Sequence, residues 1–343
     1  MKHPREVLLG AQAAAGLLPV CDHYSGVEVR MRKSLALQAE MAQEFGACVF
    51  DVTLDCEDGA TVGAEQDHAG LVVSLANDAC TNAHRAGTGI RPRIAVRVHP
   101  VHHPAFAPEV QTIVAGAGAN LCHVMVPKVE SVSDVDMAVA AIDAAGSRPP
   151  GDAMPLHVLL ESPAAVHHAF EIAAHPRVQS ISFGLMDFVS SHGGAIPASA
   201  MSVSGQFEHP LVVRAKLEVS SACHAHGKVP SHCVVTEFRD LDALARSAGR
   251  AAREYGYTRM WSIHPGQIRT LLAAFAPQRD EIDVASEIID TARRADWAPI
   301  EFSGQLHDRA SYRFFWHILE RAHQTGQVLP PSVRHYFEAS FQP

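Results

Sequence analysis

Eight short apolar runs, separated by segments with helical spacing, limit the fold of this chain more than any other feature of its sequence. The runs are rich in β-forming residues and nearly continuously apolar, which is typical of strands buried on both faces of a parallel sheet. They predict strands at Leu17–Cys21, Cys48–Asp55, Arg93–Pro100, His123–Val129, Leu156–Ser162, Ser180–Asp187, Lys228–Thr236 and Arg259–Gln267.

The segments between these runs are rich in alanine and repeat their apolar residues at helical spacing. They predict helices at Glu28–Phe45, Ala64–Arg85, Val132–Ala145, Ala164–Ala174, Leu211–His226 and Leu241–Tyr255. The repeated alternation of strand and helix predicts an α/β protein built as a (β/α)8 barrel, or TIM barrel. An open, doubly wound parallel sheet is the alternative fold.

The pattern changes after residue 267. Two segments look helical, Leu271–Phe275 and Val284–Asp296, and a turn at Phe302–Leu306 leads into an amphipathic helix at Tyr312–His323. This part has too few strong hydrophobic residues to fold alone. We therefore expect a catalytic barrel domain at residues 1–275, followed by a helical segment at 276–343 that packs on the barrel or on a neighbouring subunit.

The charge and composition exclude several classes of function. The 343 residues carry a formal net charge of −9 without a basic stripe, so nucleic acid is not an expected partner. No apolar stretch approaches the roughly 18 residues of a membrane-spanning helix, so no membrane is expected either. The seven cysteines are widely spaced and include no C-x-x-C pair, which indicates free thiols in a reducing compartment. We therefore expect a cytoplasmic protein.

Charged groups follow five of the apolar runs. They are Asp55-Cys56-Glu57-Asp58, Arg97-Val98-His99, Lys128-Val129-Glu130, Glu161 and Asp187. In a barrel the carboxyl ends of the strands converge on one mouth, where active sites lie. The amino ends of the runs show no such pattern, so the mouth is the expected site.

Two of these acids, Glu161 and Asp187, close consecutive strands in this prediction. Neighbouring strands lie about 4.8 Å apart, so the two carboxylates can share one hard cation. Mg²⁺ suits such a pair, because it takes one or two protein carboxylates and leaves its other positions to water and substrate oxygens. A 2-oxo or 2-hydroxy acid can fill those positions. The alternative is that both acids stabilise the N-termini of the helices that follow.

The charged residues of the other strands fit an anion-binding mouth. Arg97 stands between valines in a buried strand, where a charge needs a partner. Its guanidinium matches a substrate carboxylate, and a structural ion pair with Asp55 or Glu57 is the alternative; both can hold. Lys128 is either a Schiff-base lysine or, as we favour, a partner in an ion pair.

Five sequence blocks, in the same order over residues 50–268, resemble the motifs of the HpcH/HpaI aldolase/citrate lyase family. The blocks are Asp-Cys-Glu-Asp-Gly-Ala at 55–60, Arg97-Val98-His99, Pro127-Lys128-Val129-Glu130-Ser131, Glu161-Ser162 with Phe183-Gly184 and Asp187, and Ile263-His264-Pro265-Gly266-Gln267-Ile268. They are similar to D-L-E-D-A-V, R-V-N, P-K-V-E-S, I-E-T with F-G-x-x-D, and I-H-P-x-Q-I.

The resemblance implies a TIM barrel with C-terminal helices that reach a neighbouring subunit, in trimers or hexamers. It implies Mg²⁺ on Glu161 and Asp187, Arg97 on the substrate's carboxylate or carbonyl, and Glu57 in the outer shell of the metal. Gly184, Leu185 and Met186, within the F-G-x-x-D block, are expected to contact substrate together with Arg97. Asp308 stands where the malyl-CoA branch carries a catalytic Asp in a G-K-M-V-D motif.

The chain departs from the family pattern where thioester-using members carry R-S-x-L-x-x-P on the first strand. Here the sequence is Leu18-Pro19-Val20-Cys21-Asp22-His23, and Arg259-Met260-Trp261 replaces Gly-Lys before I-H-P. We therefore expect a Mg²⁺-dependent carbon–carbon lyase acting on a 2-hydroxy or 2-oxo acid or on its coenzyme A thioester. The alternatives are a pyruvate-type class II aldolase acting on free acids and a non-catalytic barrel that binds a metabolite.

Overall fold

The computed structural model describes residues 3–10, 17–59, 61–146 and 152–337. The chain divides into two compact units. The larger unit is Val20–Ala274, and the smaller one combines Met1–Pro19 with Phe275–Pro343.

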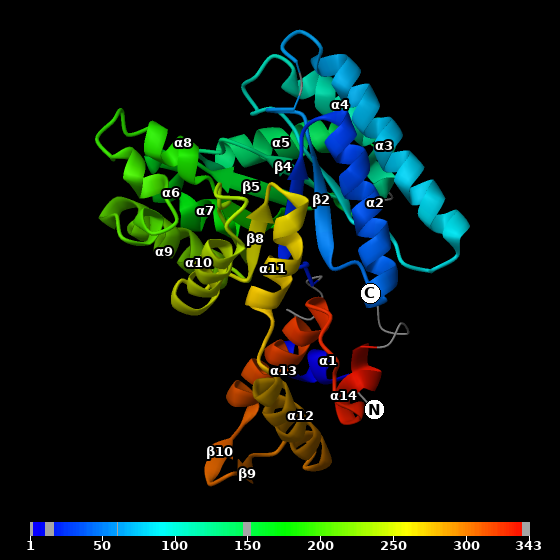
Figure 1. Ribbon diagram of the computed structural model, residues 1–343, viewed down its shortest axis with the longest axis vertical. Coiled ribbons are helices and arrows are strands. Elements are labelled where there is room, and N and C mark those ends of the chain that lie inside the picture. The colour runs from blue at the N-terminus through cyan, green and yellow to red at the C-terminus, as the bar shows by residue number, and fades with distance from the viewer. Residues whose placement is uncertain (1–2, 11–16, 60, 147–151, 338–343) are drawn as a thin grey trace. The chain divides into compact units, whose positions relative to one another are not determined.

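The larger unit contains eight parallel strands that close into a barrel in sequence order, with β1 paired to both β2 and β8 (Figure 1). The predicted TIM barrel is therefore confirmed, and the doubly wound alternative is wrong. The strands are β1 (Cys21–Ser25), β2 (Phe50–Asp55), β3 (Ile94–Arg97), β4 (Leu121–Val126), β5 (Leu156–Leu160), β6 (Val178–Phe183), β7 (Val229–His232) and β8 (Arg259–Ser262).

Helices follow the strands of the barrel. They are α2 (Glu28–Phe45), α3 (Glu65–Ala86), α4 (Phe106–Ala117), α5 (Val132–Ala145), α6 (Pro163–His167), α7 (Ala169–Ala174), α8 (Leu185–Ser190), α9 (Pro210–Ala225), α10 (Leu241–Glu254) and α11 (Pro265–Phe275). The first predicted strand, Leu17–Cys21, is placed too early, because the true strand carries Asp22, His23 and Tyr24 and does not read as apolar. These side chains are polar but largely buried within the barrel.

A buried network of charges occupies the amino ends of the strands, which we expected to lack such a pattern. Asp51 on β2 bridges two arginines: its Oδ2 lies 2.6 Å from Nη2 of Arg259 on β8, and its Oδ1 accepts a hydrogen bond from Nε of Arg93. The same Nη2 of Arg259 lies 2.8 Å from Oδ2 of Asp22 on β1. Asp22 Oδ1 in turn accepts a hydrogen bond from the Thr53 hydroxyl at 2.6 Å. The expectation for this end of the barrel is therefore wrong.

The charges of this network balance, since two carboxylates face two guanidinium groups. Burial alone would raise the pKa of Asp51, but Arg93 and Arg259 outweigh it and hold the pKa below its usual value. Two fully buried imidazoles, His123 and His157, stack beside the network with their ring centroids 3.4 Å apart. Burial lowers the pKa of His157 to about 3, so this ring is neutral. Packed polar groups thus fill the amino end of the barrel.

The smaller unit is built on α12 (Arg279–Arg294) and α13 (Arg309–Gln324). Between these helices lies a hairpin of β9 (Ile300–Phe302) and β10 (Gln305–His307), which contains the turn expected at 302–306. The unit also contains α1 (Pro4–Leu9), α14 (Pro331–Arg334) and a short 3₁₀ turn at His335–Phe337.

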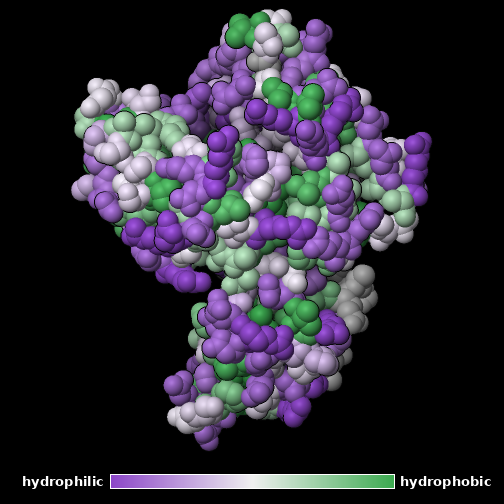
Figure 2. Space-filling model, in the orientation of Figure 1, coloured by the Kyte–Doolittle hydropathy of each residue, from purple (hydrophilic) through white to green (hydrophobic). Residues whose placement is uncertain are grey.

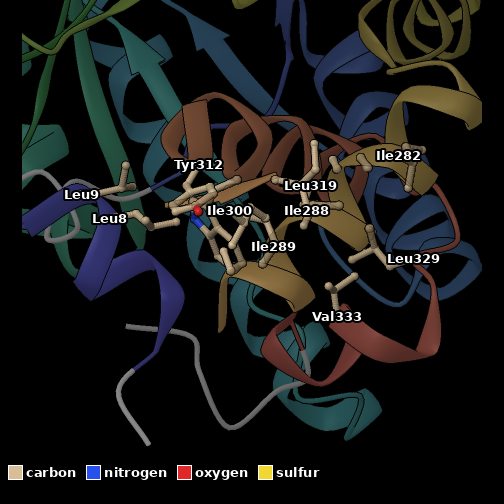
Figure 3. Close-up of a cluster of buried hydrophobic side chains, with 14 residues drawn as sticks. Leu8, Leu9, Ile282, Ile288, Ile289, Ile300, Tyr312, Leu319, Leu329 and Val333 are labelled. Carbon is tan, nitrogen blue, oxygen red and sulfur yellow. The ribbon is translucent and has the colours of Figure 1, made fainter. Parts of the chain in front are cut away.

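The first helix of the chain belongs to the core of the smaller unit. Figure 3 shows Leu8 and Leu9 directed at the cluster that includes Ile300 and Tyr312. Arg5 also lies 3.3 Å from Glu320, a pair that links α1 to α13. Residues 1–19 therefore group with the C-terminal segment and not with the barrel domain expected at 1–275, because α1 packs on α13 and its leucines belong to the buried cluster of the smaller unit.

Hydrophilic side chains cover most of the face shown in Figure 2, and hydrophobic ones appear there in small patches. None of the helices among the described residues is both long enough and apolar enough to cross a membrane.

Candidate active site at the barrel mouth

Arg97, the last residue of β3, lies at the centre of a cluster of acids at the carboxyl end of the barrel. Its Nε donates to Asp55 Oδ1 at 2.6 Å, and Nη1 lies 2.9 Å from Glu57 Oε2. Nη2 donates both to Asp58 Oδ2 at 2.7 Å and to the Tyr24 hydroxyl at 2.6 Å. Four of its five N–H groups are thereby engaged. The expected pairing with Asp55 and Glu57 is present.

The chain beside Arg97 is shaped so that its acids can face it. Asp55 ends β2, and its two carboxylate oxygens also accept the backbone N–H groups of Glu57 and Asp58, each at 3.1 Å. This tight turn needs glycine at position 59, because a Cβ there would lie 2.2 Å from the Asp55 carbonyl oxygen. The carboxylates that would repel one another are thus held around one guanidinium.

Two aromatic residues that the sequence reading did not assign to the site pack against this guanidinium. The Arg97 Cζ lies 4.6 Å from the ring centroid of Tyr24 and 5.9 Å from that of Trp261. The two rings stack with centroids 5.9 Å apart, and the buried indole nitrogen of Trp261 has no hydrogen-bond partner among the described residues. Strand alternation could have revealed both residues. It places the Tyr24 side chain on the same face of β1 as Asp22, and the Trp261 side chain on the same face of β8 as Arg259.

Glu57 connects Arg97 to a second cation. Its Oε1 accepts a hydrogen bond of 2.6 Å from Lys128 Nζ, while its Oε2 faces Arg97. Burial raises the pKa of Glu57 despite these two cations. Lys128 itself, two residues after β4, has a φ of 53°. A non-glycine residue in this left-handed region costs about 1–2 kcal/mol, so the backbone is strained where it presents the amine.

Glu161 and Asp187 line one cavity of about 250 Å³, together with Lys128 and Ser190. Glu161 directly follows β5 and is buried, whereas Asp187 is exposed. Asp187 does not close β6 as expected: the strand ends at Phe183, and Asp187 lies in the first turn of α8. The helix begins at Leu185, with Gly184 at its N-cap, so Asp187 has the helix-terminal position that we had considered as the alternative.

Glu161 is the most perturbed acid of this cavity. Its Oε2 is buried and has no hydrogen-bond partner in the part of the chain that the structure describes. Burial, and then the carboxylates of Glu57 and Asp187, raise its pKa to about 8, although Arg97 and Lys128 oppose the shift. A buried carboxylate that has an unpartnered oxygen and lies beside a second acid needs additional positive charge nearby in order to ionise. The donor set therefore fits a divalent cation bound through oxygen ligands.

The remaining predicted residues lie in different places. Gly184 caps α8, and Leu185 and Met186 form the start of that helix between Glu161 and Asp187 in the sequence. Asp308 belongs to the smaller unit, where it caps α13 and accepts the Ala310 N–H at 2.9 Å. The structure thus brings Arg97, Glu57, Glu161 and Asp187 to one end of the barrel, while Asp308 has a local structural role in another unit.

His99 differs from the expected anion-binding pattern. It follows Arg97 by two residues, but its Nδ1 lies 3.1 Å from both carboxylate oxygens of Glu109 on α4. Its backbone N–H also donates to Glu109 at 2.8 Å. This side chain fixes the loop after β3 onto α4.

The chain is similar to known proteins over most of its length. The family model described as HpcH/HpaI aldolase/citrate lyase matches residues 34–265. The chain is 30% identical over 241 residues to an L-malyl-CoA/beta-methylmalyl-CoA lyase of Cereibacter sphaeroides, an alignment that covers 65% of this chain and 74% of that protein.

The chain belongs to the HpcH/HpaI aldolase/citrate lyase family.

Solved structures support this membership at the level of the whole chain. A citrate lyase from Burkholderia xenovorans LB400 is 46% identical, with a TM-score of 0.77, and the match covers 98% of this chain and 99% of that one. The CitE protein of Mycobacterium tuberculosis shares the fold at 20% identity, with a TM-score of 0.60 and coverage of 90% and 98%. Both the barrel and its helical extension therefore have counterparts in solved structures.

Gly184, in the F-G-x-x-D block of the family, provides a test of the site's packing. A Cβ at this position would lie 2.5 Å from Cγ and 2.7 Å from Oε1 of Glu161. We expect Gly184→Ala to push the Glu161 carboxylate aside and to weaken Mg²⁺ binding by about 10–100-fold. Calorimetric titration with Mg²⁺ measures this.

The matched control is Gly70→Ala on α3, where an added Cβ meets no atom within 4 Å. This variant should bind Mg²⁺ as the wild type does and should gain stability, since alanine favours a helix over glycine by about 1 kcal/mol. Equal Mg²⁺ affinity in the two variants would show that Glu161 does not depend on the space at Gly184.

Proposed function

We propose that this protein is a Mg²⁺-dependent carbon–carbon lyase that cleaves or forms the bond next to a carbonyl of a small carboxylic acid. The observation that carries the proposal is the buried Glu161 carboxylate, unpartnered at Oε2 and facing the same cavity as Asp187. Membership in a family described by its aldolases and citrate lyases supports the reaction class.

Glu161 and Asp187 are the residues that would hold the cation. They offer carboxylate oxygens, the ligands that Mg²⁺ prefers, and the cavity between them leaves room for substrate oxygens. When bound, Mg²⁺ supplies Lewis-acid stabilisation of negative charge on a substrate oxygen. The M. tuberculosis protein has been solved in complexes with magnesium and oxaloacetate, with magnesium and pyruvate, and with magnesium, acetoacetate and coenzyme A.

The protein's own groups would provide the remaining electrostatics. Arg97 keeps one N–H of Nη1 uncommitted, and one of its partners, Asp58, is 72% exposed and free to be replaced by a substrate oxygen. Its charge would stabilise the enolate oxygen that develops as the carbon–carbon bond breaks. Glu57 would hold Arg97 in position and stay in the outer shell of the metal. The substrate would be contacted beside Asp187 by Gly184, Leu185 and Met186.

The substrate would be a 2-hydroxy or 2-oxo acid or its coenzyme A thioester. Relatives named as lyases and thioesterases of malyl-CoA support a thioester. The alternative, a class II aldolase acting on free acids, is favoured by one observation: β1 carries Asp22 and Tyr24, both engaged in side-chain hydrogen bonds, and no Arg-Ser pair.

We further propose that the protein acts in the cytoplasm as a homo-oligomer, a trimer or a hexamer. The support is the set of seven cysteines, free where the structure describes them, and the smaller unit, whose exposed Leu306 and Phe314 flank Asp308 in the sequence. In such an assembly Asp308 would serve as a catalytic residue contributed by the smaller unit.

A metal-supplemented screen tests the function. The full-length protein would be assayed with Mg²⁺ against malate, citramalate and their coenzyme A thioesters, with release of pyruvate, glyoxylate or acetyl-CoA as the readout. Cleavage that requires Mg²⁺ supports a lyase. Mg²⁺-dependent binding without cleavage of any acid or thioester would favour a non-catalytic, metabolite-binding barrel instead.

Arg97→Lys is expected to lower the rate by about 10²–10³-fold with the substrate found in that screen. A lysine keeps the charge, but its single ammonium cannot contact Asp55, Glu57 and a substrate oxygen at the same time. Steady-state kinetics measure the loss. The exposed Arg32→Lys change on α2 is the control and should leave the rate unchanged; near-normal turnover by Arg97→Lys would contradict the role of the guanidinium.

A further inference from the structure

The cavity that contains the acid pair contains a cation other than Arg97. Arg97 does not line this cavity, and its side chain is only 6% exposed. Four of its N–H groups are already hydrogen-bonded or ion-paired to the protein. An anion that enters the cavity beside Glu161 therefore meets at most the one uncommitted N–H of Arg97 Nη1.

Lys128 does line the cavity, and its side chain is 46% exposed. Its ammonium group carries three N–H donors, and Glu57 is its one hydrogen-bond partner among the described residues. Contact with Glu57 raises the pKa of Lys128 against the effect of burial, so the group is charged. Two donors thus remain for an anion.

The backbone conformation at Lys128 is also unusual. Within the described part of the barrel unit, Lys128 is the non-glycine residue with a positive φ. Glycine would adopt this conformation without strain, so the side chain is retained at a cost in stability. Strain of this kind persists where the surrounding structure enforces it and gathers at functional sites.

The geometry points to a carboxylate-binding subsite at Lys128: its Nζ, fixed at one side by Glu57, receives the carboxylate of a 2-oxo or 2-hydroxy acid in the cavity shared with Glu161 and Asp187. The inference rests on the proposed function and extends it. It makes Lys128 a substrate-binding residue, whereas the sequence offered it only as a Schiff-base or ion-pair lysine. Arg97 then interacts with the carbonyl oxygen of the substrate instead of with its carboxylate.

The subsite has an electrostatic signature that a structural role would not produce. Removing the positive charge of Lys128 weakens the attraction for an anionic substrate. The same change removes a repulsion from a cation bound by the nearby acids, since Lys128 interacts electrostatically with both Glu161 and Asp187. Substrate and metal affinities should therefore move in opposite directions, whereas local unfolding would weaken both.

The experiment titrates the full-length protein first with Mg²⁺ alone and then, at saturating Mg²⁺, with pyruvate as the carboxylate probe. For Lys128→Gln we expect pyruvate binding to weaken about tenfold, which corresponds to about 1.4 kcal/mol, and Mg²⁺ binding to be unchanged or tighter. Lys128→Arg should restore pyruvate binding to within about threefold, because it keeps the charge. Lys33→Gln on α2 is the matched control: Lys33 is exposed, has no ion pair among the described contacts, and should alter neither affinity.

Pyruvate affinity unchanged within about twofold in a Lys128→Gln protein that still binds Mg²⁺ would overturn the subsite and leave the proposed function standing. Weaker binding of both Mg²⁺ and pyruvate would overturn it too, in favour of a structural role for Lys128. A wild-type protein that binds no Mg²⁺ would refute the proposed function itself, and the subsite with it.

Discussion

Replacing Glu161 with glutamine is expected to lower Mg²⁺-dependent turnover by about a hundredfold or more and to abolish measurable Mg²⁺ binding. One metal ion provides several kcal/mol of transition-state stabilisation, and every 1.36 kcal/mol is a factor of ten in rate. Glutamine has nearly the same shape but no charge. The metal-free variant should be as stable as the wild type or more stable, because the buried carboxylate that it replaces lacks a partner at Oε2.

Calorimetry, steady-state kinetics and thermal unfolding without metal measure these three quantities. Glu171→Gln on α7 is the control, since its side chain is 70% exposed and pairs with His168 on the surface. It should change none of them appreciably. A Glu161→Gln protein that still bound Mg²⁺ with wild-type affinity would remove the basis of the proposed metal site.

Asp51→Asn is expected to have the largest effect on stability, a loss of about 3–5 kcal/mol in the free energy of unfolding. Asp51 is fully buried and pairs with both Arg93 and Arg259, so its loss leaves Asp22 as the one carboxylate of the network facing two guanidinium groups. The pKa of Asp51 is held below its usual value in the folded protein. The stability that Asp51 contributes is therefore fully present above its pKa in the unfolded chain, and this stability is lost as the pH falls through its pKa in the folded protein.

Denaturant unfolding of the wild type and the variant at neutral pH measures the difference. The control is Glu44→Gln, which breaks the exposed pair with Arg269 on the surface of the same unit. This change should have a far smaller effect, because solvent screens such a pair. If Asp51→Asn proved no more destabilising than Glu44→Gln, the buried network would not contribute to the stability of the barrel.

The sequence was a reliable guide to the barrel because buried parallel strands leave a continuous apolar pattern. Seven of the eight predicted strands share four or more residues with the observed ones, and the first shares only Cys21 with β1. The predicted helices Glu28–Phe45 and Val132–Ala145 match α2 and α5 to the residue. The first strand was misplaced for a physical reason. A strand whose inward residues include Asp22 and Tyr24 does not look buried until Arg259, Thr53 and Arg97 are seen to satisfy them.

The charged groups at the mouth were predictable where a single residue stands out in its strand, and their mutual contacts were less so. Glu161 and Arg97 stand out locally, because each is a charge at the end of an apolar strand. The occupation of Arg97 by Asp58 and Tyr24, and the salt link from Glu57 to Lys128, depend on loops whose approach the sequence does not reveal. The charged network at the other end of the barrel was missed because its members are scattered over β1, β2 and β8 and the residue before β3.

The smaller unit is assembled from the two ends of the chain, and this has a consequence for biosynthesis. Leu8 and Leu9 leave the ribosome more than 300 residues before Tyr312 and Trp316 of α13, which belong to the same buried cluster, have been made. Throughout that interval the nascent barrel can close, while the leading helix has nowhere to bury its leucines. Chaperone binding to a ribosome-bound chain should therefore concentrate on its first nineteen residues and cease only after α12 and α13 emerge.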